Sequence, residues 1–190
     1  VGWACQLYAD LLGHWEKRNL GALADIDPNN LDQDGLLAYA RDYASEDFLA
    51  VMEARAARKS VVANAVSPVD GFDDFAACGF DTEEKLVGQF VDQFYFGCEA
   101  DDPINAWAFS RAHLPHGVQL NTLFGSDIGH FDVRDMSGVL TEAHELVDEE
   151  LIDVDNFRDF VFENAVRFLS RNNRDFFAGT AVEKAVADYW

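Results

Sequence analysis

The sequence is short of basic residues. Lys and Arg together number 14 against 35 Asp and Glu, which gives a formal charge of −21 over 190 residues. A protein this acidic repels the phosphate backbones of nucleic acids and anionic lipid surfaces at ordinary salt. We therefore expect neither nucleic acid nor a membrane as a partner. The acidic residues are spread along the chain, a pattern typical of a heavily solvated surface.

Cysteines and long apolar runs are also scarce. Cys5, Cys78 and Cys98 are the only cysteines, and no C-x-x-C pair occurs, so the sequence indicates neither a disulfide framework nor a zinc knuckle. No apolar run approaches the roughly 20 residues of a membrane span. The first residues lack the charged and apolar regions of a secretory signal. The expected compartment is the cytoplasm.

Large apolar side chains are plentiful. The chain is 49% hydrophobic and contains 16 Phe and four Trp, which is enough for a globular core. It is shorter than the roughly 250 residues of a complete (β/α)8 barrel. It also begins at Val1 without Met and already within an apolar-periodic segment, so we expect a piece of a longer protein. Residues 60–81, where Pro68, Gly71 and Gly79 interrupt the periodicity, are expected to be an irregular insertion.

Apolar residues recur every three or four positions through most of the chain, which predicts a mostly helical protein. The first helix is expected at about residues 3–18, and Asp32 is expected to cap a helix that ends near Tyr43. Ser45 or Asp47 can open the next helix. Further helices are predicted at about residues 48–59, 82–92, 103–113, 139–146, 157–169 and 181–190.

Two short apolar segments have the character of buried parallel strands. Residues 93–98 are largely aromatic and lead into Glu99, Asp101, Asp102 and Pro103. Residues 120–127 repeat the pattern and end in Gly125, Ser126 and Asp127. Two strands that each end in acidic residues, with a helix between them, indicate a parallel α/β architecture.

The candidate chemistry lies just after these strands. In parallel barrels the carboxyl ends of the strands form the active face, where Asp127 could bind a divalent metal or act as a base toward metal-bound water. Its plain alternative is a turn or helix cap. His130 is either a substrate contact or an exposed loop histidine. Glu99 is a substrate-side candidate, whereas Asp102 fits a helix cap and Cys98 fits strand packing.

The run Gly125-Ser126-Asp127-Ile128-Gly129-His130 resembles the last-strand motif, roughly G-[ST]-D-x-P-H, of the amidohydrolase-related family that includes the aminocarboxymuconate semialdehyde decarboxylase type. Gly129 stands where that motif has Pro. Residues 3–18 are similar to the helix after the family's sixth strand, and residues 94–103 to its seventh strand. Glu163-Asn164-Ala165 resembles part of the closing helix. The resemblance covers the chain outside about residues 20–85.

The resemblance implies that the chain is the C-terminal part of a metal-dependent (β/α)8 barrel. Asp127 would be the last ligand of a divalent metal, with Zn²⁺ preferred over Mn²⁺ or Mg²⁺. The family's H-x-H pair and further histidines would come from an absent N-terminal half, since no H-x-H occurs among the five histidines here. The implied activity is hydrolysis or non-oxidative decarboxylation of a small, carboxylated organic substrate. Many barrels of this type form homodimers, and the isolated chain is expected to be inactive.

A second hypothesis belongs to another class of protein. The chain could be a small acidic α/β module, complete in itself, that binds a partner through its helices and has no catalytic activity. The discriminating feature is a self-sufficient core, because two or three strands cannot close a barrel and their edges would be exposed.

Overall fold

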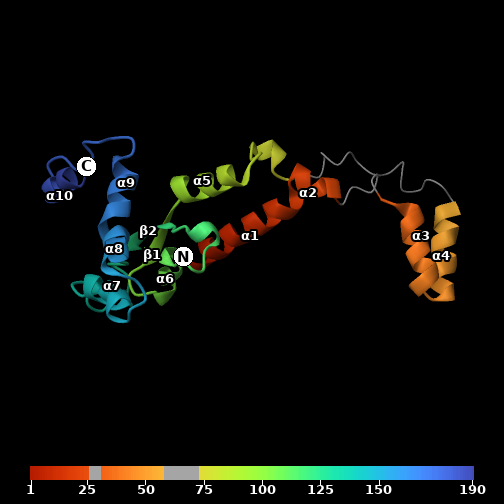
Figure 1. The fold of residues 1–190 in the computed structure, drawn as a ribbon. Helices are drawn as coiled ribbons and strands as arrows, with labels where there is room; N and C mark the ends of the chain where they lie inside the picture. Colours follow the sequence, from red (N-terminus) through yellow and green to blue (C-terminus); the bar gives the residue numbers. More distant parts are fainter. Residues whose placement is uncertain (26–30, 58–72) are drawn as a thin grey trace. The chain divides into compact units, whose positions relative to one another are not determined.

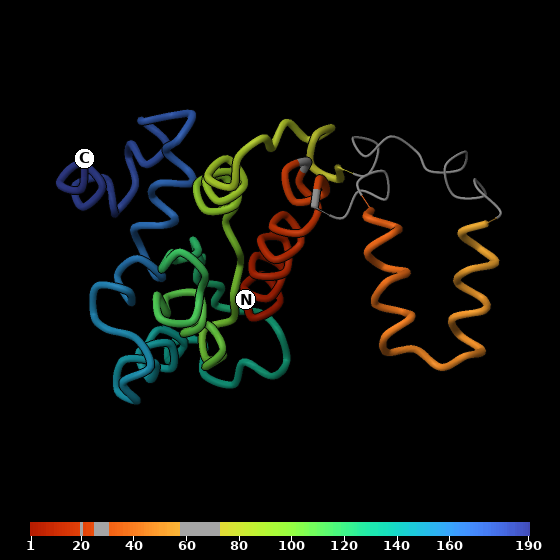
Figure 2. The backbone as a smooth tube through the Cα atoms, turned by 45° about the vertical axis from the view of Figure 1, so that its right-hand side comes forward, coloured from red at the N-terminus to blue at the C-terminus, as the bar shows by residue number. Residues whose placement is uncertain are grey.

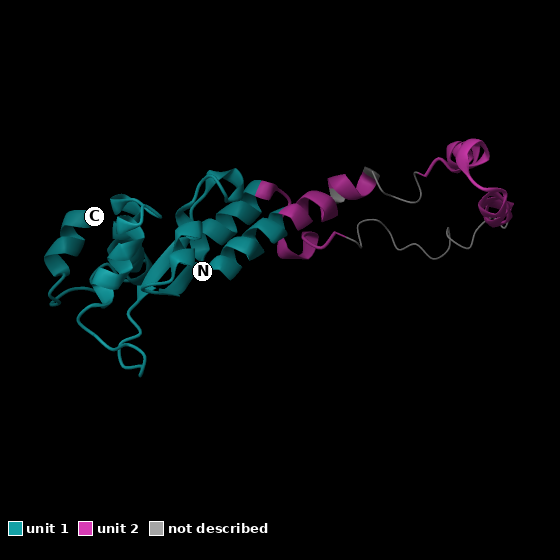
Figure 3. Cartoon of the chain, turned by 90° about the horizontal axis from the view of Figure 1, so that it is seen from below, with its two compact units in different colours: residues 1–12, 84–190 teal, residues 13–83 magenta. Residues whose placement is uncertain are grey.

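The computed structural model describes residues 1–25, 31–57 and 73–190 (Figure 1). These residues form a mixed α/β structure that is mostly helical and contains a parallel two-stranded sheet. The chain divides into two compact units, coloured in Figure 3. Unit 1 is Val1–Leu12 with Glu84–Trp190, and unit 2 is Gly13–Glu83. Of the expected insertion at 60–81, residues 60–72 lie outside the described residues, and the remainder contains the short 3₁₀-helix η3, Ala76–Cys78.

The sheet of unit 1 consists of the two predicted strands. Strands β1 (Tyr95–Glu99) and β2 (Asn121–Gly125) are parallel, and their last residues, Glu99 and Gly125, are register partners. The connection contains the 3₁₀-helix η4 (Pro103–Asn105), α6 (Ala106–Phe109) and the 3₁₀-helix η5 (Pro115–Gly117). The predicted helix at 103–113 is therefore too long: α6 ends where Ser110 becomes extended, at φ −82° and ψ 93°.

Aromatic packing joins the sheet to the helices that precede it. Helix α1 (Gly2–Arg18) matches its prediction, and α5 (Glu83–Gln93) leads directly into β1. Phe96 of β1 lies with its ring centroid 5.6 Å from that of Trp3 and 5.7 Å from that of Phe90. Such aromatic pairs contribute beyond their buried area. They fix one face of β1 against α1 and α5.

A long C-terminal helix packs on β2. It consists of α8 (Val154–Arg158), a π-helical turn η6 (Asp159–Glu163) and α9 (Asn164–Ser170). Phe160 is fully buried, with its ring 5.8 Å from Phe124 and 6.4 Å from Phe109. Asn164 donates a 2.9 Å hydrogen bond to the carbonyl oxygen of Thr122. One apolar and one polar contact thus attach this helix to the sheet.

The same helix begins three residues earlier than the predicted start at Phe157, because Asp153 caps it. The Asp153 carboxylate accepts a 2.7 Å hydrogen bond from the backbone N–H of Asn156. We expect Asp153→Ala to lower the free energy of unfolding by about 1 kcal/mol, the usual contribution of such a cap. Urea denaturation measures it. Asp155→Ala, which removes an exposed carboxylate two residues further on, is the control and should change stability by less than half as much.

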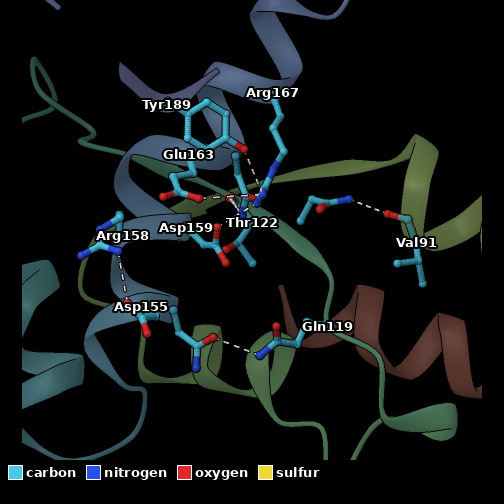
Figure 4. Close-up of polar contacts among 12 residues, drawn as sticks. Val91, Gln119, Thr122, Asp155, Arg158, Asp159, Glu163, Arg167 and Tyr189 are labelled. Atoms are coloured by element: carbon cyan, nitrogen blue, oxygen red, sulfur yellow. Dashed lines mark hydrogen bonds and ion pairs between the residues drawn. The ribbon is translucent and has the colours of Figure 1, made fainter. Parts of the chain in front are cut away.

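The other helices of unit 1 agree with the sequence. Helix α7 (Val139–Asp148) buries Val139, Ala143 and Leu146, and α10 (Glu183–Tyr189) buries Val186. Arg167 of α9 donates a 2.8 Å hydrogen bond to Asp159 and another to the Tyr189 hydroxyl, so it connects α9 to α10 (Figure 4).

Burial and the neighbouring Asp159 raise the pKa of the Glu163 carboxyl above its usual value.

Unit 2 contains α2 (Leu20–Asp25) and a helical hairpin formed by α3 (Gln33–Tyr43) and α4 (Glu46–Ala57), whose helices run in opposite directions (Figure 2). The predicted cap is confirmed: Asp32 accepts a 2.9 Å hydrogen bond from the N–H of Gly35. The last two residues of the helix predicted at 48–59 lie outside the described residues. Within the described part of the chain, no helix is long and apolar enough to span a membrane.

Candidate functional site

The carboxyl ends of β1 and β2 border a hollow of about 270 Å³. Glu99, the last residue of β1, lines it, and so do Ser126 and Asp127 directly after β2. Residues from both strands line the same hollow because parallel pairing brings the carboxyl ends of the two strands to the same edge of the sheet. Glu99 and Asp127, which the sequence placed after separate strands, therefore lie in one hollow.

The loop after β2 turns His130 back onto Asp127. Asp127 has a left-handed backbone at φ 52°, and Gly129 follows at φ 109°. His130 donates its backbone N–H to the carbonyl oxygen of Asp127 at 3.2 Å. In the side chains, Nδ1 of His130 lies 2.6 Å from Oδ1 of Asp127. Since the His130 side chain is 71% exposed, this pair is open to solvent.

Three side chains of this loop could hold a metal ion together. The candidate ligand atoms of Asp127, His130 and Asp132 all lie within 4.8 Å of one another. Carboxylate oxygen and imidazole nitrogen are ordinary zinc ligands, and three protein ligands with one open position are typical of catalytic zinc. The sequence prediction placed Asp127 at the metal but gave no role to Asp132. The usable signal was its position two residues after His130 in a glycine-containing loop.

The hollow is strongly acidic. Five carboxylates line it, and Arg134 is the one cation in its lining. The carboxylates belong to Glu99, Asp101, Asp127, Asp132 and Glu142. Such a lining attracts a divalent cation, because each carboxylate adds to the negative potential of a highly charged protein. Arg134 is the group of this lining that can pair with an anion.

Nearby candidates take structural roles. The Asp102 carboxylate accepts a 3.0 Å hydrogen bond from the N–H of Ile104, which caps η4 as predicted. Cys98 is buried in β1, and burial raises the pKa of its thiol, so it is a poor nucleophile at neutral pH. His113 and His116 lie in the connection before β2, and Nδ1 of His113 contacts the Ser110 hydroxyl at 2.6 Å.

A substitution at Gly129 tests whether the backbone conformation of this loop holds His130 next to Asp127. At φ 109° this residue occupies a region that proline, fixed near −65°, cannot adopt. We expect Gly129→Pro to move His130 away from Asp127. The change would appear as a shift of the His130 ring resonances in NMR spectra. Gly97→Ala, at an exposed strand position with open space around an added Cβ, is the control. Unchanged His130 resonances in the proline variant would contradict this account of the loop.

No family model, no curated protein and no solved structure matches the chain.

Proposed function

We propose that the chain is the C-terminal part of a longer metal-dependent enzyme with a (β/α)8 barrel of the amidohydrolase-related type. Its reaction would be hydrolysis or non-oxidative decarboxylation of a small, carboxylated organic molecule. The observation that carries the proposal is the position of Glu99 and Asp127, at the carboxyl ends of neighbouring parallel strands and on one hollow. This end of the strands is where parallel barrels place their catalytic groups.

The sheet itself supports a larger parent. Parallel sheets are normally covered on both faces and contain more than two strands. In β1, Gly97 and Glu99 are exposed, whereas Phe96 and Cys98 are buried. One face of this strand is therefore open. In the proposed barrel, further parallel strands lie beside β1 and β2, and the open face is turned toward the barrel interior. A cytoplasmic location and a homodimer are parts of the same proposal.

The residues present fit part of a metal site. Asp127 would hold a divalent ion, with zinc preferred and manganese or magnesium as alternatives, and the remaining ligands would come from the N-terminal half of the parent. A bound ion of this kind supplies Lewis acidity and lowers the pKa of a bound water. The Asp127 carboxylate could also accept a proton during the reaction. His130, 2.6 Å from the Asp127 carboxylate, and Glu99 would contact the substrate.

A negatively charged substrate would need a cation in the lining, and Arg134 is that cation. A carboxylated molecule approaches a lining of five carboxylates, and Arg134 is the cation in that lining that can pair with it. The proposal therefore assigns substrate orientation to Arg134 and proton transfer to the Asp127 side of the hollow.

The test uses the full-length parent and its Asp127→Ala variant. We expect the variant to bind the divalent ion at least about 100-fold more weakly, since even residues that only orient a metal ligand contribute 10- to 100-fold. Titration with a competing chelator measures the affinity. Asp135→Ala is the matched control, because Asp135 belongs to the same loop but accepts hydrogen bonds from Ser137. Equal affinity in wild type and Asp127→Ala would overturn the proposal.

The interaction module remains the second candidate, and the α3–α4 hairpin favours it. Tyr39, Tyr43 and Phe48 expose 69%, 83% and 56% of their surfaces, and Ala40 is the buried residue of α3. Exposed apolar groups of this kind are common at protein interfaces. A parent protein that binds no divalent ion would favour this candidate.

A further inference from the structure

A second hollow lies at the opposite ends of the strands from the proposed metal site. Its volume is about 610 Å³, within the range of small-molecule sites. Tyr95 and Asn121, the first residues of β1 and β2, line it. The end of α5, the connection between β1 and β2 and the helix that contains η6 form the remaining walls. This hollow shares no lining residue with the one at Asp127.

The amide side chains of this lining are held in fixed orientations. Gln119 donates to the carbonyl oxygen of Phe109 at 2.9 Å and to the Asn156 side chain at 3.0 Å. Asn121 donates to the carbonyl oxygens of Val91 and Phe94, and the first of these bonds is drawn in Figure 4. Side chains fixed in this way lose little conformational entropy when a ligand binds. The lining is therefore preorganised.

The π-helical turn contributes a neutralised ion pair. It starts at Asp159 and is followed directly by Asn164, and both residues line the hollow. Arg167, one turn further, donates to the Asp159 carboxylate at 2.8 Å and also to the Asn164 side chain. Turns of this type occur frequently at functional sites. The charges of Asp159 and Arg167 offset each other, so neither dominates ligand recognition.

Two further charged side chains of the lining, Arg111 and Asp92, have no oppositely charged partner among the described residues. The Arg111 guanidinium donates to the carbonyl oxygen of Gly117 and to Oε1 of Gln119, each at 3.0 Å, and both partners are uncharged. Asp92 lies at the end of α5. Within the described parts of the chain, neither Arg111 nor Asp92 forms an ion pair. The hollow thus combines one uncompensated cation with one uncompensated anion.

We propose that this hollow binds a small zwitterion of the amino-acid type, with its carboxylate on Arg111 and its ammonium group on Asp92. Arginine suits a carboxylate because its planar guanidinium can form two parallel hydrogen bonds. A molecule with both charges matches the lining, whereas a simple acid leaves Asp92 uncompensated and a simple amine leaves Arg111 uncompensated. The site shares no lining residue with the hollow at Asp127, so it does not rest on the proposed metal.

The test starts with the 190-residue chain and a mixture of the twenty standard amino acids, examined by saturation-transfer NMR. The strongest binder is then titrated beside two analogues, one without the amino group and one without the carboxylate. We expect each analogue to bind at least about tenfold more weakly than the amino acid, since each loses one charge-assisted contact. No binding of any amino acid at millimolar concentration, or equal binding of the three compounds, overturns the proposal.

Variants assign the two charges. Arg111→Gln is expected to weaken the amino acid about tenfold and to remove the preference over the amine, and Asp92→Asn to remove the preference over the acid. Asp92→Asn is less prone to disturb the fold than Arg111→Gln, because Arg111 also donates a hydrogen bond to the carbonyl oxygen of Gly117 in the loop. Arg158→Gln and Asp155→Asn are the matched controls, since this ion pair lies on α8, in the same compact unit but outside the lining. Equal losses in the controls would contradict the assignment and indicate a bulk charge effect.

Discussion

Phe160→Ala is expected to lower the free energy of unfolding by about 3–5 kcal/mol, the usual cost of emptying a buried aromatic site. The Phe160 side chain is fully buried and contacts both Phe109 of α6 and Phe124 of β2. Its removal would leave a cavity between the C-terminal helix and the sheet that positions Asp127. Because small domains are stable by only about 5–15 kcal/mol, thermal unfolding should show a large decrease in melting temperature.

Phe131→Ala is the matched control for this variant. Phe131 is 98% exposed, in the loop that carries His130, so its truncation removes the same atoms without leaving a cavity. We expect a change within about 0.5 kcal/mol. If both variants had the same stability, the C-terminal helix would not pack on β2 as described.

The second large effect concerns the metal. The isolated 190-residue chain should bind Zn²⁺ no more tightly than a Kd of about 0.1 mM, near 5.5 kcal/mol of binding free energy, whereas closed structural zinc sites reach about 10–16 kcal/mol. The physical reason is the exposure of the ligand group: Asp132 and His130 are exposed, and Asp127 is only partly covered. Isothermal titration calorimetry of the isolated chain with Zn²⁺ measures this Kd.

Binding to the chain should also depend on all three side chains of the ligand group. Asp132→Asn and His130→Gln are each expected to weaken Zn²⁺, while Asp101→Asn, in the same hollow but outside the group, should leave the affinity within about twofold. Micromolar or tighter binding by the isolated chain would mean that the site is complete without further ligands. The proposed dependence on an N-terminal half would then be wrong.

Local sequence signals predicted most of the elements. The aromatic run before Glu99 and the apolar run before Gly125 predicted both strands, and Asp32 predicted the start of α3. The errors arose where tertiary contacts or caps determine the boundary. Helix α6 ends at Phe109 because the backbone of Ser110 is extended, and Asp153 starts the C-terminal helix before its apolar periodicity becomes visible.

The sequence was enough to predict which residues of the candidate site lie at the ends of the two strands. Parallel pairing could be inferred from two strands separated by a helix, and it is enough to bring Glu99 and Asp127 to one edge. The direction of His130 could not be inferred. It depends on the left-handed backbone of Asp127 and on φ 109° at Gly129, which a sequence pattern does not specify. Asp132 joins the group for the same reason.

The most direct test of the metal-site proposal is the anomalous diffraction of crystals of the full-length parent, recorded across the zinc, manganese and other transition-metal absorption edges. The account predicts an anomalous peak about 2.0–2.2 Å from a carboxylate oxygen of Asp127, with histidines from the N-terminal half as further ligands. A divalent ion bound elsewhere, with Asp127 hydrogen-bonded only to His130 and other groups of its own loop, would contradict it.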